Sequence, residues 1–478
     1  TPQASAVYSA PTNILVAVSV SDSYPIQSVQ LYNNDVLFGT LTNPPYAFVL
    51  RNLTQTTYNF VAHVFDNQGY SGVSLQVSVT VTNDPAREPL FNLTDLGALL
   101  GPANQALGLN GYGLVVGGST TPTSSYQPFF DNNGVVQWLP LFGGQSLGGG
   151  GYATGINNSN MITGNAATSS GYGHAFRFDG TNLVDLGTFG GQQSSGAAIN
   201  ASGEIVGSAA DANNQSRAFL YANGKMTNLD TFGGASSAAT AINTTGQVVG
   251  YAAFPPGDVI GFLYYPGASN QILGNLGSSV CLPYTINDAG QIAGEAGTAG
   301  GYNHAFLSLQ GFMADLGTLG GFNSAALGMN NYGQIVGWSE NDQLQDHAFL
   351  WQNDVMYDLN DLIPTNAAWT LQYATAINDA GQIVGYGLNG GDENDQAFLL
   401  TLATNSPVLP QDSQLLAYIA GQFNLNLPVP LGSPFVLQAS TNLLNWIPVA
   451  TNYDRTGLLN LTDPHATATR FYRAVPLH

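Results

Sequence analysis

The chain has 478 residues, of which only 8% are charged, compared with about a quarter in an ordinary soluble protein. Twenty-nine acidic and eight basic residues give a net charge of −21, and Lys225 is the only lysine. Such a chain can neutralise few phosphates, which argues against nucleic acid and anionic membranes as partners. The single cysteine, Cys281, excludes an internal disulfide, and no run of 18 apolar residues predicts a membrane span.

Residues 1–83 contain short segments that alternate apolar and polar residues between turn residues, such as "ILVAVSVSDS" and "TYNFVAHVFDNQG". This alternation predicts an immunoglobulin-like β-sandwich. The stretches "DVLFGTLTNPPYAFVL" and "FVAHVFDNQGYSG" resemble bacterial immunoglobulin-like modules. The segment before Ile14 is short for the first strand of such a module, which predicts an incompletely filled edge. Residues 84–88, "DPARE", are the predicted linker.

An internal repeat begins after this linker. The phrase "INDAGQIAG" at 286–294 returns as "INDAGQIVG" at 377–385, and its Asn recurs at steps of 43 to 48 residues. A period in the forties is typical of a repeat architecture. The recurring Asn residues are Asn110, Asn157, Asn200, Asn243, Asn287, Asn330 and Asn378.

Three other landmarks follow the same period. A Gly closes each phrase, at Gly117, Gly164, Gly207, Gly250, Gly294, Gly337 and Gly385. A Phe follows, assigned to Phe130, Phe176, Phe219, Phe262, Phe306, Phe349 and Phe398. A Leu ends a "DL"-like pair, assigned to Leu96, Leu139, Leu186, Leu229, Leu276, Leu316 and Leu359.

Each unit contains four short runs of four to six residues, rich in Val, Ile, Phe and Tyr and separated by Gly or Asn. This pattern predicts four strands per unit, the first two joined by a type I turn followed by a left-handed residue. Asn160 stands in the Gly position of one turn, and Asn also adopts the left-handed conformation readily.

The order of the landmarks separates a closed propeller from an open solenoid. The first landmark, Leu96, marks a fourth strand with no unit before it, and the last, Phe398, marks a third strand with no fourth strand after it. The two ends can therefore share one composite blade. Residues 89–402 are predicted to form a seven-bladed β-propeller of four-stranded blades, so that the whole chain is all-β.

The motifs "HAFLW", "DLGTLGG" and "INDAGQIVG" are similar to the HAF-type repeat of extracellular bacterial proteins. The resemblance covers about 315 residues and implies export and a propeller-like fold, but no particular activity. A start at Thr1 without Met fits a protein exported to the cell exterior or surface after signal-peptide removal, although a shortened chain would look the same. Residues 403–478 are predicted to form a third, sandwich-like unit. "FVLQASTNLLNWIPVATN" and "LTDPHATATRFYRAV" in it resemble a C-terminal β-module of secreted bacterial proteins.

No catalytic signature is present: the sequence lacks GxSxG, HExxH, GxxxxGK[ST] and any Cys pair. We therefore expect no enzyme activity, no cofactor and no metal. His174, His304 and His347 precede "AF" in three units, where other units hold Pro128, Arg217 and Gln396. Because equivalent positions on separate blades lie on a ring, a structural role is favoured over a metal trio.

Other polar positions also receive structural interpretations. The "DL" carboxylates exchange with Asn228 and Asn275, which indicates turn capping; they are Asp95, Asp185, Asp315 and Asp358. The acidic loops 339–346 and 391–396 lack the DxDxDG spacing of calcium loops, and we expect them to be solvated. Asn-x-Ser/Thr sequons occur at Asn52, Asn92, Asn157, Asn200, Asn214, Asn243 and Asn460.

Two functions remain open at this point. Low charge and β-sandwiches at both ends predict a non-enzymatic extracellular structural protein that polymerises head to tail into a filament or surface layer. The segment before Ile14 would receive or donate a strand in that assembly. The alternative is a secreted or cell-surface module that binds a polysaccharide, using the 23 Tyr and 5 Trp for stacking.

Overall fold

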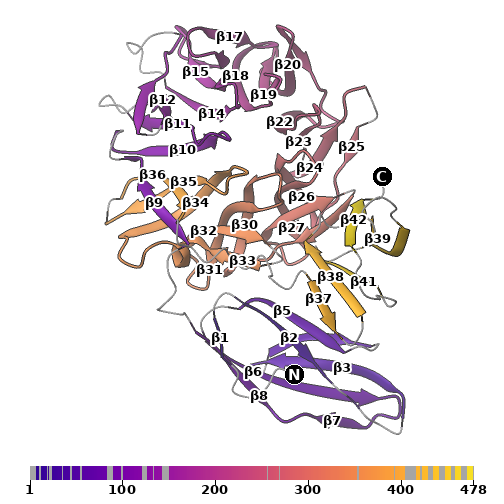
Figure 1. Ribbon diagram of the computed structural model, residues 1–478. Coiled ribbons are helices and arrows are strands. Elements are labelled where there is room, and N and C mark those ends of the chain that lie inside the picture. Colours follow the sequence, from indigo (N-terminus) through magenta and orange to yellow (C-terminus); the bar gives the residue numbers. More distant parts are fainter. Residues whose placement is uncertain are drawn as a thin grey trace. The chain divides into compact units, whose positions relative to one another are not determined.

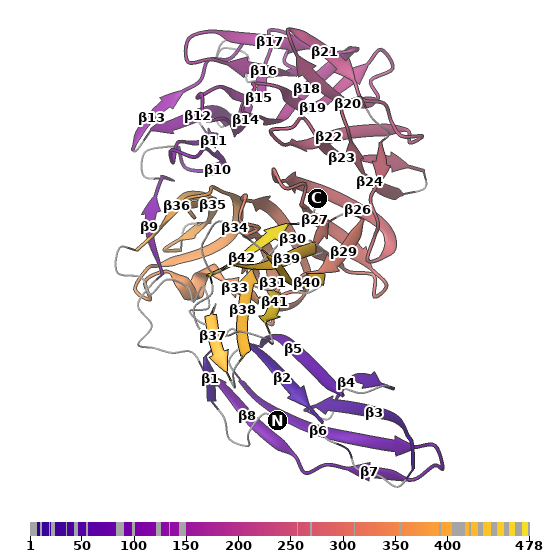
Figure 2. The ribbon, with the colours of Figure 1, turned by 45° about the vertical axis from the view of Figure 1, so that its right-hand side comes forward.

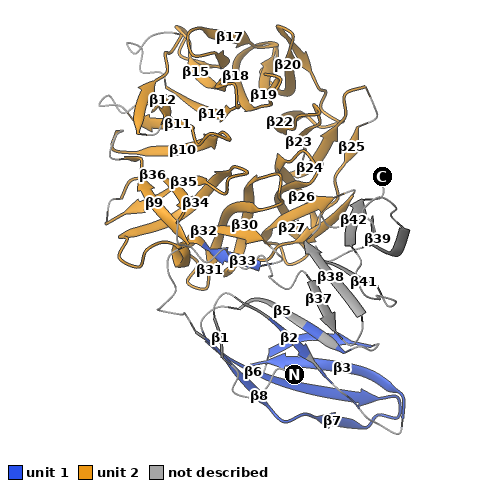
Figure 3. Ribbon diagram, viewed as in Figure 1, with its two compact units in different colours: residues 1–87, 354–358 blue, residues 88–353, 359–478 orange. Residues whose placement is uncertain are grey.

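The structure is a computed structural model of residues 1–478. It describes all residues except 1–6, 10–11, 19, 21–23, 35, 43–45, 54–55, 83–89, 98–100, 121–125, 133, 143–149, 256, 268–269, 310, 353–354, 392, 404–415, 420–421, 429–433, 441–446, 454–457, 464–470 and 477–478. The predicted linker 84–88 lies outside the described residues. The chain divides into two compact units (Figure 3). The first unit contains residues 1–87 and 354–358, and the second contains residues 88–353 and 359–478.

Five four-stranded sheets and one eight-stranded sheet occupy the repeat region (Figure 1). The eight-stranded sheet consists of two four-stranded groups, so we number the groups of four strands as blades 1 to 7. Blade 1 consists of β10 (Asn104–Leu109), β11 (Val115–Thr120), β12 (Tyr126–Asn132) and β13 (Val135–Trp138). Blade 2 consists of β14 (Gly151–Ile156), β15 (Ile162–Ala167), β16 (Gly173–Phe178) and β17 (Leu183–Gly187). Blade 3 consists of β18 (Gly190–Ile199), β19 (Ile205–Asp211), β20 (Ser216–Ala222) and β21 (Lys225–Asn228). Blade 4 consists of β22 (Ser236–Ile242), β23 (Val248–Phe254), β24 (Asp258–Tyr264) and β25 (Gln271–Ile272).

Blades 5 to 7 continue the series. Blade 5 is β26 (Gly277–Ile286), β27 (Ile292–Thr298), β28 (Asn303–Leu309) and β29 (Phe312–Asp315), and a single parallel bridge from Val259 to Val280 links it to blade 4. Blade 6 is β30 (Gly320–Met329), β31 (Ile335–Asn341), β32 (Asp346–Gln352) and β33 (Val355–Asp358), followed by the 3-10 turn η3 (Leu359–Leu362). Blade 7 is β34 (Trp369–Ile377), β35 (Ile383–Asn389), β36 (Gln396–Leu402) and β9 (Phe91–Asp95).

Blade 7 closes the ring as the landmark order predicts. Strand β9 pairs antiparallel with β36, with Asp95 opposite Phe398 and Phe91 opposite Leu402. The first strands of neighbouring blades contact one another around the ring, and β10 contacts β34 (Figure 2). One buried cluster, which includes Val115 and Val384, joins blades 1 and 7. The prediction of an all-β propeller with a composite closing blade is therefore confirmed.

The recurring Asn side chains explain the repeat chemically. Each Oδ1 accepts hydrogen bonds from the backbone N–H groups two and four residues later, at 3.0 to 3.2 Å, which fixes the predicted turn. Each Nδ2 donates to the carbonyl oxygen of the equivalent Asn in the next blade, at 3.0 to 3.2 Å, and Asn378 donates to Asn110. Seven such bonds form a closed circle, hereafter the Asn ring. The amide side chain supplies the acceptor on Oδ1 and the donor on Nδ2, two separate atoms that point to the turn and to the next blade, respectively.

The residue that ends each turn has the predicted left-handed conformation. Gly333 and Gly381 have φ values of +75° and +74°, and Asn160 has φ +60°. The landmark glycines, such as Gly117, are required for a steric reason, since the first strand leaves no room for a side chain there. A Cβ at Gly117 would lie 1.9 Å from the carbonyl oxygen of Gln105 in that strand. In every blade except blade 1, the predicted Phe is fully buried and lies opposite the landmark Gly.

Two landmark assignments are wrong by a few residues. In blade 1, Phe129, and not Phe130, is fully buried and pairs with Gly117. Because the two phenylalanines in "FFD" are adjacent, the local sequence could not show which of them is the buried landmark. The position equivalent to the His residues is accordingly Gln127, and not Pro128, because Gln127 pairs with Ser119.

In blade 4, Leu273 takes the position predicted for Leu276: it is 7% exposed, and its N–H donates to the carbonyl oxygen of Gly261. The preceding position is therefore Ile272, which pairs with Phe262, and not Asn275. The fourth strand of this blade has only two residues. The sequence "LGNLG" offers two leucines, and strand pairing alone selects the first one.

The N-terminal unit contains two sheets. The larger has the order β1 (Val7–Ser9), β8 (Val77–Thr82), β6 (Thr56–Asp66), β3 (Ile26–Asn33) and β4 (Val36–Leu41), with β7 (Ser71–Val73) paired to β6. The smaller has two strands, β2 (Thr12–Ala17) and β5 (Ala47–Leu53). Buried Ile14 and Leu50 from the small sheet pack with Val29, Phe60 and Val79 from the large one, which makes a sandwich core.

The described residues of 403–478 form six strands in two three-stranded sheets. These are β37 (Leu416–Ile419), β38 (Gln422–Pro428) and β41 (Leu458–Asp463), and β40 (Ile447–Tyr453), β39 (Pro434–Ser440) and β42 (Phe471–Pro476). The predicted boundaries of the three domains stay predictions. Within the described part of the chain, no helix is both long and apolar enough to cross a membrane.

Candidate functional site

The predicted His and Asp candidates meet in pairs within single blades. The Nδ1 atoms of His174 and His304 lie 2.9 Å from carboxylate oxygens of Asp185 and Asp315, respectively. Each pair joins the third strand of a blade to the fourth. The pairing explains why both residue types recur, and the sequence missed it because the partners are on different strands.

The hydrogen bond that His304 Nδ1 donates to the Asp315 carboxylate is the main cause that raises the pKa of His304. Burial acts to raise the pKa of Asp315, but the hydrogen bonds from His304 and the Gly317 N–H, with the imidazolium charge, lower it overall. The pair therefore stabilises the fold while His304 is protonated and Asp315 is ionised.

Replacement of His304 by Gln should cost more stability at pH 5.5 than at pH 9. Because the folded pKa of His304 is raised, the imidazolium's contribution is complete below the unfolded value near 6.5 and is lost as the pH rises through the folded value. The side chains are 23% and 42% exposed, so we expect the difference to be at most about 1 kcal/mol. Urea unfolding at both pH values measures it, and an Asp315→Asn variant should show the same trend. An equal loss at both pH values would contradict the ion pair.

The "DL" carboxylates also cap turns as predicted. Oδ1 of Asp95, Asp185 and Asp315 accepts a hydrogen bond of 2.8 Å from the N–H two residues later. Among the described residues, no three His, Cys, Asp or Glu side chains lie close enough together to hold a metal ion. The structure thus does not bring His174, His304 and His347 together with each other. Cys281 is 2% exposed, and burial raises the pKa of its thiol to about 11, which fits the predicted buried apolar role.

Three of the predicted glycosylation sequons coincide with the Asn ring. Asn157, Asn200 and Asn243 are 6%, 4% and 3% exposed, and their Nδ2 atoms donate to the neighbouring blade. A glycan on Nδ2 would break these bonds, so these sequons are inaccessible in the folded protein.

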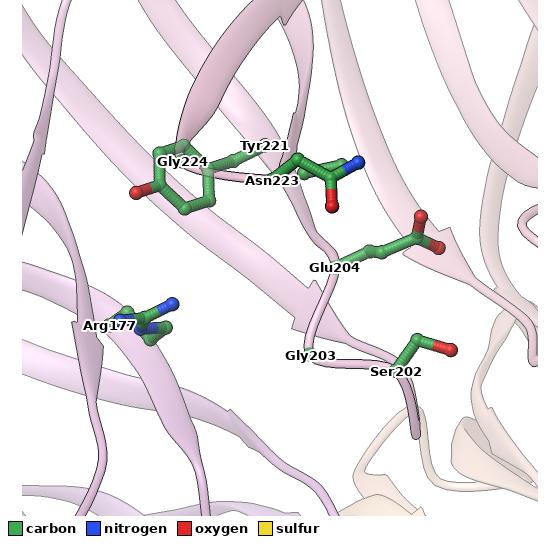
Figure 4. A pocket seen from close by; sticks show the side chains of 8 residues that line it. Arg177, Ser202, Gly203, Glu204, Tyr221, Asn223 and Gly224 are labelled. Atoms are coloured by element: carbon green, nitrogen blue, oxygen red, sulfur yellow. The ribbon is translucent and has the colours of Figure 1, made fainter.

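A hollow of about 280 Å³ lies between blades 2 and 3 (Figure 4). Arg177 of β16 stands on one side of it, and Glu204 and Tyr221 stand on the other. Arg177 Nε is buried without a hydrogen-bond partner among the described residues. The lining of the hollow combines one cation, Arg177, with one carboxylate, Glu204, and the hydroxyl groups of Ser202 and Tyr221.

The N-terminal sandwich exposes an apolar edge. Val36, Leu37 and Phe38 begin β4, the last strand of the large sheet, and are 69%, 48% and 46% exposed. We call these three residues the β4 edge. An exposed apolar strand at a sheet edge is a template for pairing with another strand. More exposed large apolar side chains lie elsewhere in this unit: Tyr24, Tyr70, Val73 and Leu75.

The small sheet of the same sandwich also has open edges. Among the described residues, only β2 and β5 pair in it, so each strand has one side without a neighbour. The short first strand, β1, pairs parallel with β8 of the large sheet and not with β2. The outer edge of β2 is where a further strand would complete the sheet, in line with the expectation of an incompletely filled edge.

Charge is distributed unevenly along the chain. Residues 1–83 contain three Asp and one Arg, a net charge of −2, and residues 403–478 contain three Asp and three Arg, a net charge of zero. The remaining residues, 84–402, therefore carry −19 of the total −21. The two terminal modules can approach one another with little electrostatic repulsion, whereas two propellers cannot.

A second surface, which the sequence did not predict, combines aromatic and acidic side chains on blades 1, 2, 6 and 7. We define the tyrosine–aspartate cluster as Tyr126, Tyr152, Trp338, Tyr373, Tyr386, Asp346 and Asp395. Both aspartates come from the loops 339–346 and 391–396 that the sequence indicated as acidic. No signal in the sequence connects the tyrosines, because they are up to 260 residues apart.

Comparison with known proteins identifies one module. Residues 1–62 match the sequence family described as "Bacterial Ig domain". This match confirms the immunoglobulin-like prediction for the N-terminal part. No curated protein matches the chain.

Solved structures provide only distant likenesses. The fibronectin(III)-like modules of Clostridium thermocellum CbhA are 26% identical, covering 17% of this chain and 90% of theirs, with a TM-score of 0.17. TolB from Acinetobacter baumannii is 10% identical over 63% of this chain and 75% of its own, with a TM-score of 0.38. SGBP-B of the Bacteroides ovatus mixed-linkage glucan utilization locus, in complex with a mixed-linkage heptasaccharide, is 10% identical over 98% of this chain and 92% of its own, with a TM-score of 0.15. At these TM-scores, the likenesses carry no argument about function.

The immunoglobulin-like domain supports the broader form of the sequence prediction, an extracellular protein with a structural or binding role. The resemblance to HAF-type repeats and to a C-terminal module of secreted proteins stays a prediction.

Proposed function

We propose that this chain is a non-enzymatic extracellular structural protein that assembles head to tail into a filament or surface layer. The observation that carries the proposal is the β4 edge, three consecutive exposed apolar residues on the last strand of a sheet. Monomeric proteins usually protect such edges with charge, proline or a covering element. Residues 36–41 contain neither a charged residue nor a proline.

The partner in this proposal is a second copy of the same chain. Its nearly neutral terminal modules lower the repulsion that the acidic propellers exert on one another. A contact between unlike ends of identical chains does not close on itself and produces an open polymer. Addition of a strand to the open edge of β4 or β2 would supply backbone hydrogen bonds without requiring charged contacts.

A double substitution, Val36→Lys and Phe38→Lys, should abolish polymers while leaving the sandwich folded. Both side chains are at least 46% exposed, although Phe38 also makes an edge contact with the buried Phe48 ring at 6.4 Å between centroids. The two positive charges oppose strand addition. Electron microscopy and sedimentation of the full chain measure assembly. The matched control is Val135→Lys with Phe312→Lys, which changes two similarly exposed residues on blades 1 and 5. The proposal would be overturned if the β4 variant formed polymers of the same length and amount as the wild type. It would also be overturned if the wild type stayed monomeric at high concentration.

Deletion of residues 1–13 separates strand exchange from simple edge contact. The deletion removes β1 and the first two residues of β2. Strand exchange through this segment predicts shorter or absent polymers. Unchanged assembly would eliminate the segment as donor or acceptor and leave the β4 edge as the contact.

A further inference from the structure

The tyrosine–aspartate cluster is built from two stacked pairs. Tyr126 and Tyr152 have ring centroids 4.8 Å apart with an interplanar angle of 28°, and Tyr373 and Tyr386 are 5.0 Å apart at 20°. Trp338 lies against Tyr373 at 5.9 Å. All five side chains are only partly buried. Together they form an aromatic platform that is partly open to solvent.

Two carboxylates hold this platform together. Tyr373 Oη donates a hydrogen bond to Asp346 Oδ2, and Gln105 Nε2 donates to Asp395 Oδ2 at 2.7 Å. Burial is the main cause that raises the pKa of Tyr386 to about 12, and the carboxylates of Asp395 and Asp346 raise it further. Burial, with Tyr126 and Asp395, likewise raises the pKa of Tyr152 to about 12. The phenols therefore stay protonated and can donate hydrogen bonds at physiological pH.

The pseudo-symmetry of the ring shows that these aromatics are not needed to join blades. Strand register makes the residue after each landmark Gly equivalent in all blades: Gly118, Asn165, Ser208, Tyr251, Glu295, Trp338 and Tyr386. Their partners on the first strands are Gln105, Tyr152, Ser195, Ala238, Leu282, Ala325 and Tyr373. Blade 3 uses two serines at these positions, so a blade forms without aromatic residues there.

One glycine makes room for the platform. A Cβ at Gly118 would lie 2.3 Å from Cδ1 of Tyr152, so the Tyr152 ring lies directly over this position of the preceding blade. Within the described residues, no hydrogen bond uses the hydroxyls of Tyr126, Tyr152 or Tyr386. Three phenol hydroxyls beside partly exposed rings are thus without a protein hydrogen-bond partner among these residues.

We infer that the tyrosine–aspartate cluster is a binding platform for a neutral saccharide, presented on the side of the propeller opposite the Asn ring. Asp346 and Tyr126 begin third strands and Asp395 directly precedes one, whereas the Asn turns join first to second strands at the other end of each blade. The apolar face of a pyranose ring packs on aromatic rings, and its hydroxyls suit phenol and carboxylate partners. A net charge of −19 in residues 84–402 disfavours anionic sugars.

An organic cation is the competing ligand class, since aromatic faces and carboxylates also attract positive charge. The structure favours the saccharide because both carboxylates already accept hydrogen bonds from neutral groups, Tyr373 and Gln105. Within each tyrosine pair the two rings also stack on one another, and stacked rings do not enclose a central space as a cation cage does.

Binding to the full chain should be tested with hexasaccharides of β-1,4-glucan, β-1,3-glucan, β-mannan and chitin by titration calorimetry, with choline as the cationic probe. We expect one neutral oligosaccharide to bind, and Trp338→Ala or Tyr386→Ala to weaken it at least about tenfold. Gly118→Val should weaken it similarly, because it displaces Tyr152 without removing a polar group. The matched control is Tyr284→Phe, which removes a tyrosine–carboxylate bond, Oη to Glu295 Oε1 at 3.0 Å, in blade 5.

Three outcomes would overturn the inference: choline alone binds, no saccharide binds, or binding survives Trp338→Ala, Tyr386→Ala and Gly118→Val. The variants' circular dichroism spectra show whether each propeller is folded, and Tyr386→Phe serves where an alanine variant does not fold, because it keeps the ring and removes only the hydroxyl. Saccharide binding and polymer assembly use different surfaces. The cluster variants should therefore polymerise as the wild type does, so failure of one proposal is distinguishable from failure of the other.

Discussion

Replacing Gly337 by Ala is expected to destabilise the propeller by about 3 kcal/mol, the upper part of the range for overpacking substitutions. The new Cβ would lie 1.9 Å from the carbonyl oxygen of Ala325 and 2.9 Å from Cε1 of Phe349. Phe349 is fully buried, so its ring cannot move aside without disturbing the core of blade 6. The clash with Ala325 is with backbone, and relieving it would separate β30 from β31. Urea unfolding, followed by tryptophan fluorescence, measures the loss.

Gly274→Ala is the matched control for this prediction. No heavy atom lies within 4 Å of a Cβ at Gly274, so its effect should stay within about 0.5 kcal/mol. Neither glycine has a positive φ, and the comparison therefore isolates the steric effect from backbone conformation. Equal stability of the two variants would show that the close approach at the landmark glycine is not the reason for its recurrence.

Replacing Asn330 by Asp is expected to cost a similar amount, about 3 kcal/mol, because it breaks the Asn ring. The amide Nδ2 donates to the carbonyl oxygen of Asn378 at 3.1 Å and to Gln334 Oε1 at 2.7 Å. An aspartate oxygen in its place would face two acceptors in a site where Asn330 is 4% exposed. The hydrogen bonds from the Tyr332 and Gln334 N–H groups to Oδ1 of residue 330 would remain, so the turn would be kept. The loss of stability therefore measures mainly the removal of the Nδ2 donor, which joins blade 6 to blade 7.

The effect of Asn330→Asp should depend on pH. A neutral carboxyl group can donate a hydrogen bond, so the folded state favours protonation and raises the carboxyl pKa above its unfolded value. The variant should accordingly be less destabilised near pH 4 than at pH 8. Asn158→Asp makes the same charge change at an exposed position of the equivalent turn in blade 2, where Oδ1 accepts a hydrogen bond from the Gly111 N–H that an aspartate can keep. It should cost less than about 1 kcal/mol at either pH. A loss at Asn330 no larger than at Asn158 would contradict a stabilising role for the ring.

Much of the fold follows from local sequence chemistry. A turn that starts with Asn and ends in a left-handed residue, a glycine where two strands approach closely and a buried Phe opposite it recur together in each blade. Such requirements act within a few residues, so the period is visible in the sequence. The unpaired landmarks at Leu96 and Phe398 even indicated that β9 completes blade 7, since a sheet lacking its fourth strand leaves an open edge.

Register was decided by cross-strand pairing. Two adjacent phenylalanines and two nearby leucines satisfy the same local pattern, and only the pairs of Phe129 with Gly117 and of Ile272 with Phe262 select between them. The His–Asp pairs depend on the same pairing, since His304 and Asp315 are 11 residues apart on neighbouring strands. A one-residue shift reverses the face on which a side chain lies, which local composition cannot report.

By itself, the sequence determined that this protein is an all-β propeller of repeated units with an immunoglobulin-like module before it, because turn residues and strand alternation are encoded within short segments. Only the tertiary structure decided which residues lie on one surface. Closure of the ring brings Asp395 near Tyr126 and Tyr152, although more than 240 residues separate them. The β4 edge likewise became apparent only when the sheet order placed β4 last. Sites built from distant strands depend on which side chains the closed ring and the sheet order bring together, and no periodic pattern records that.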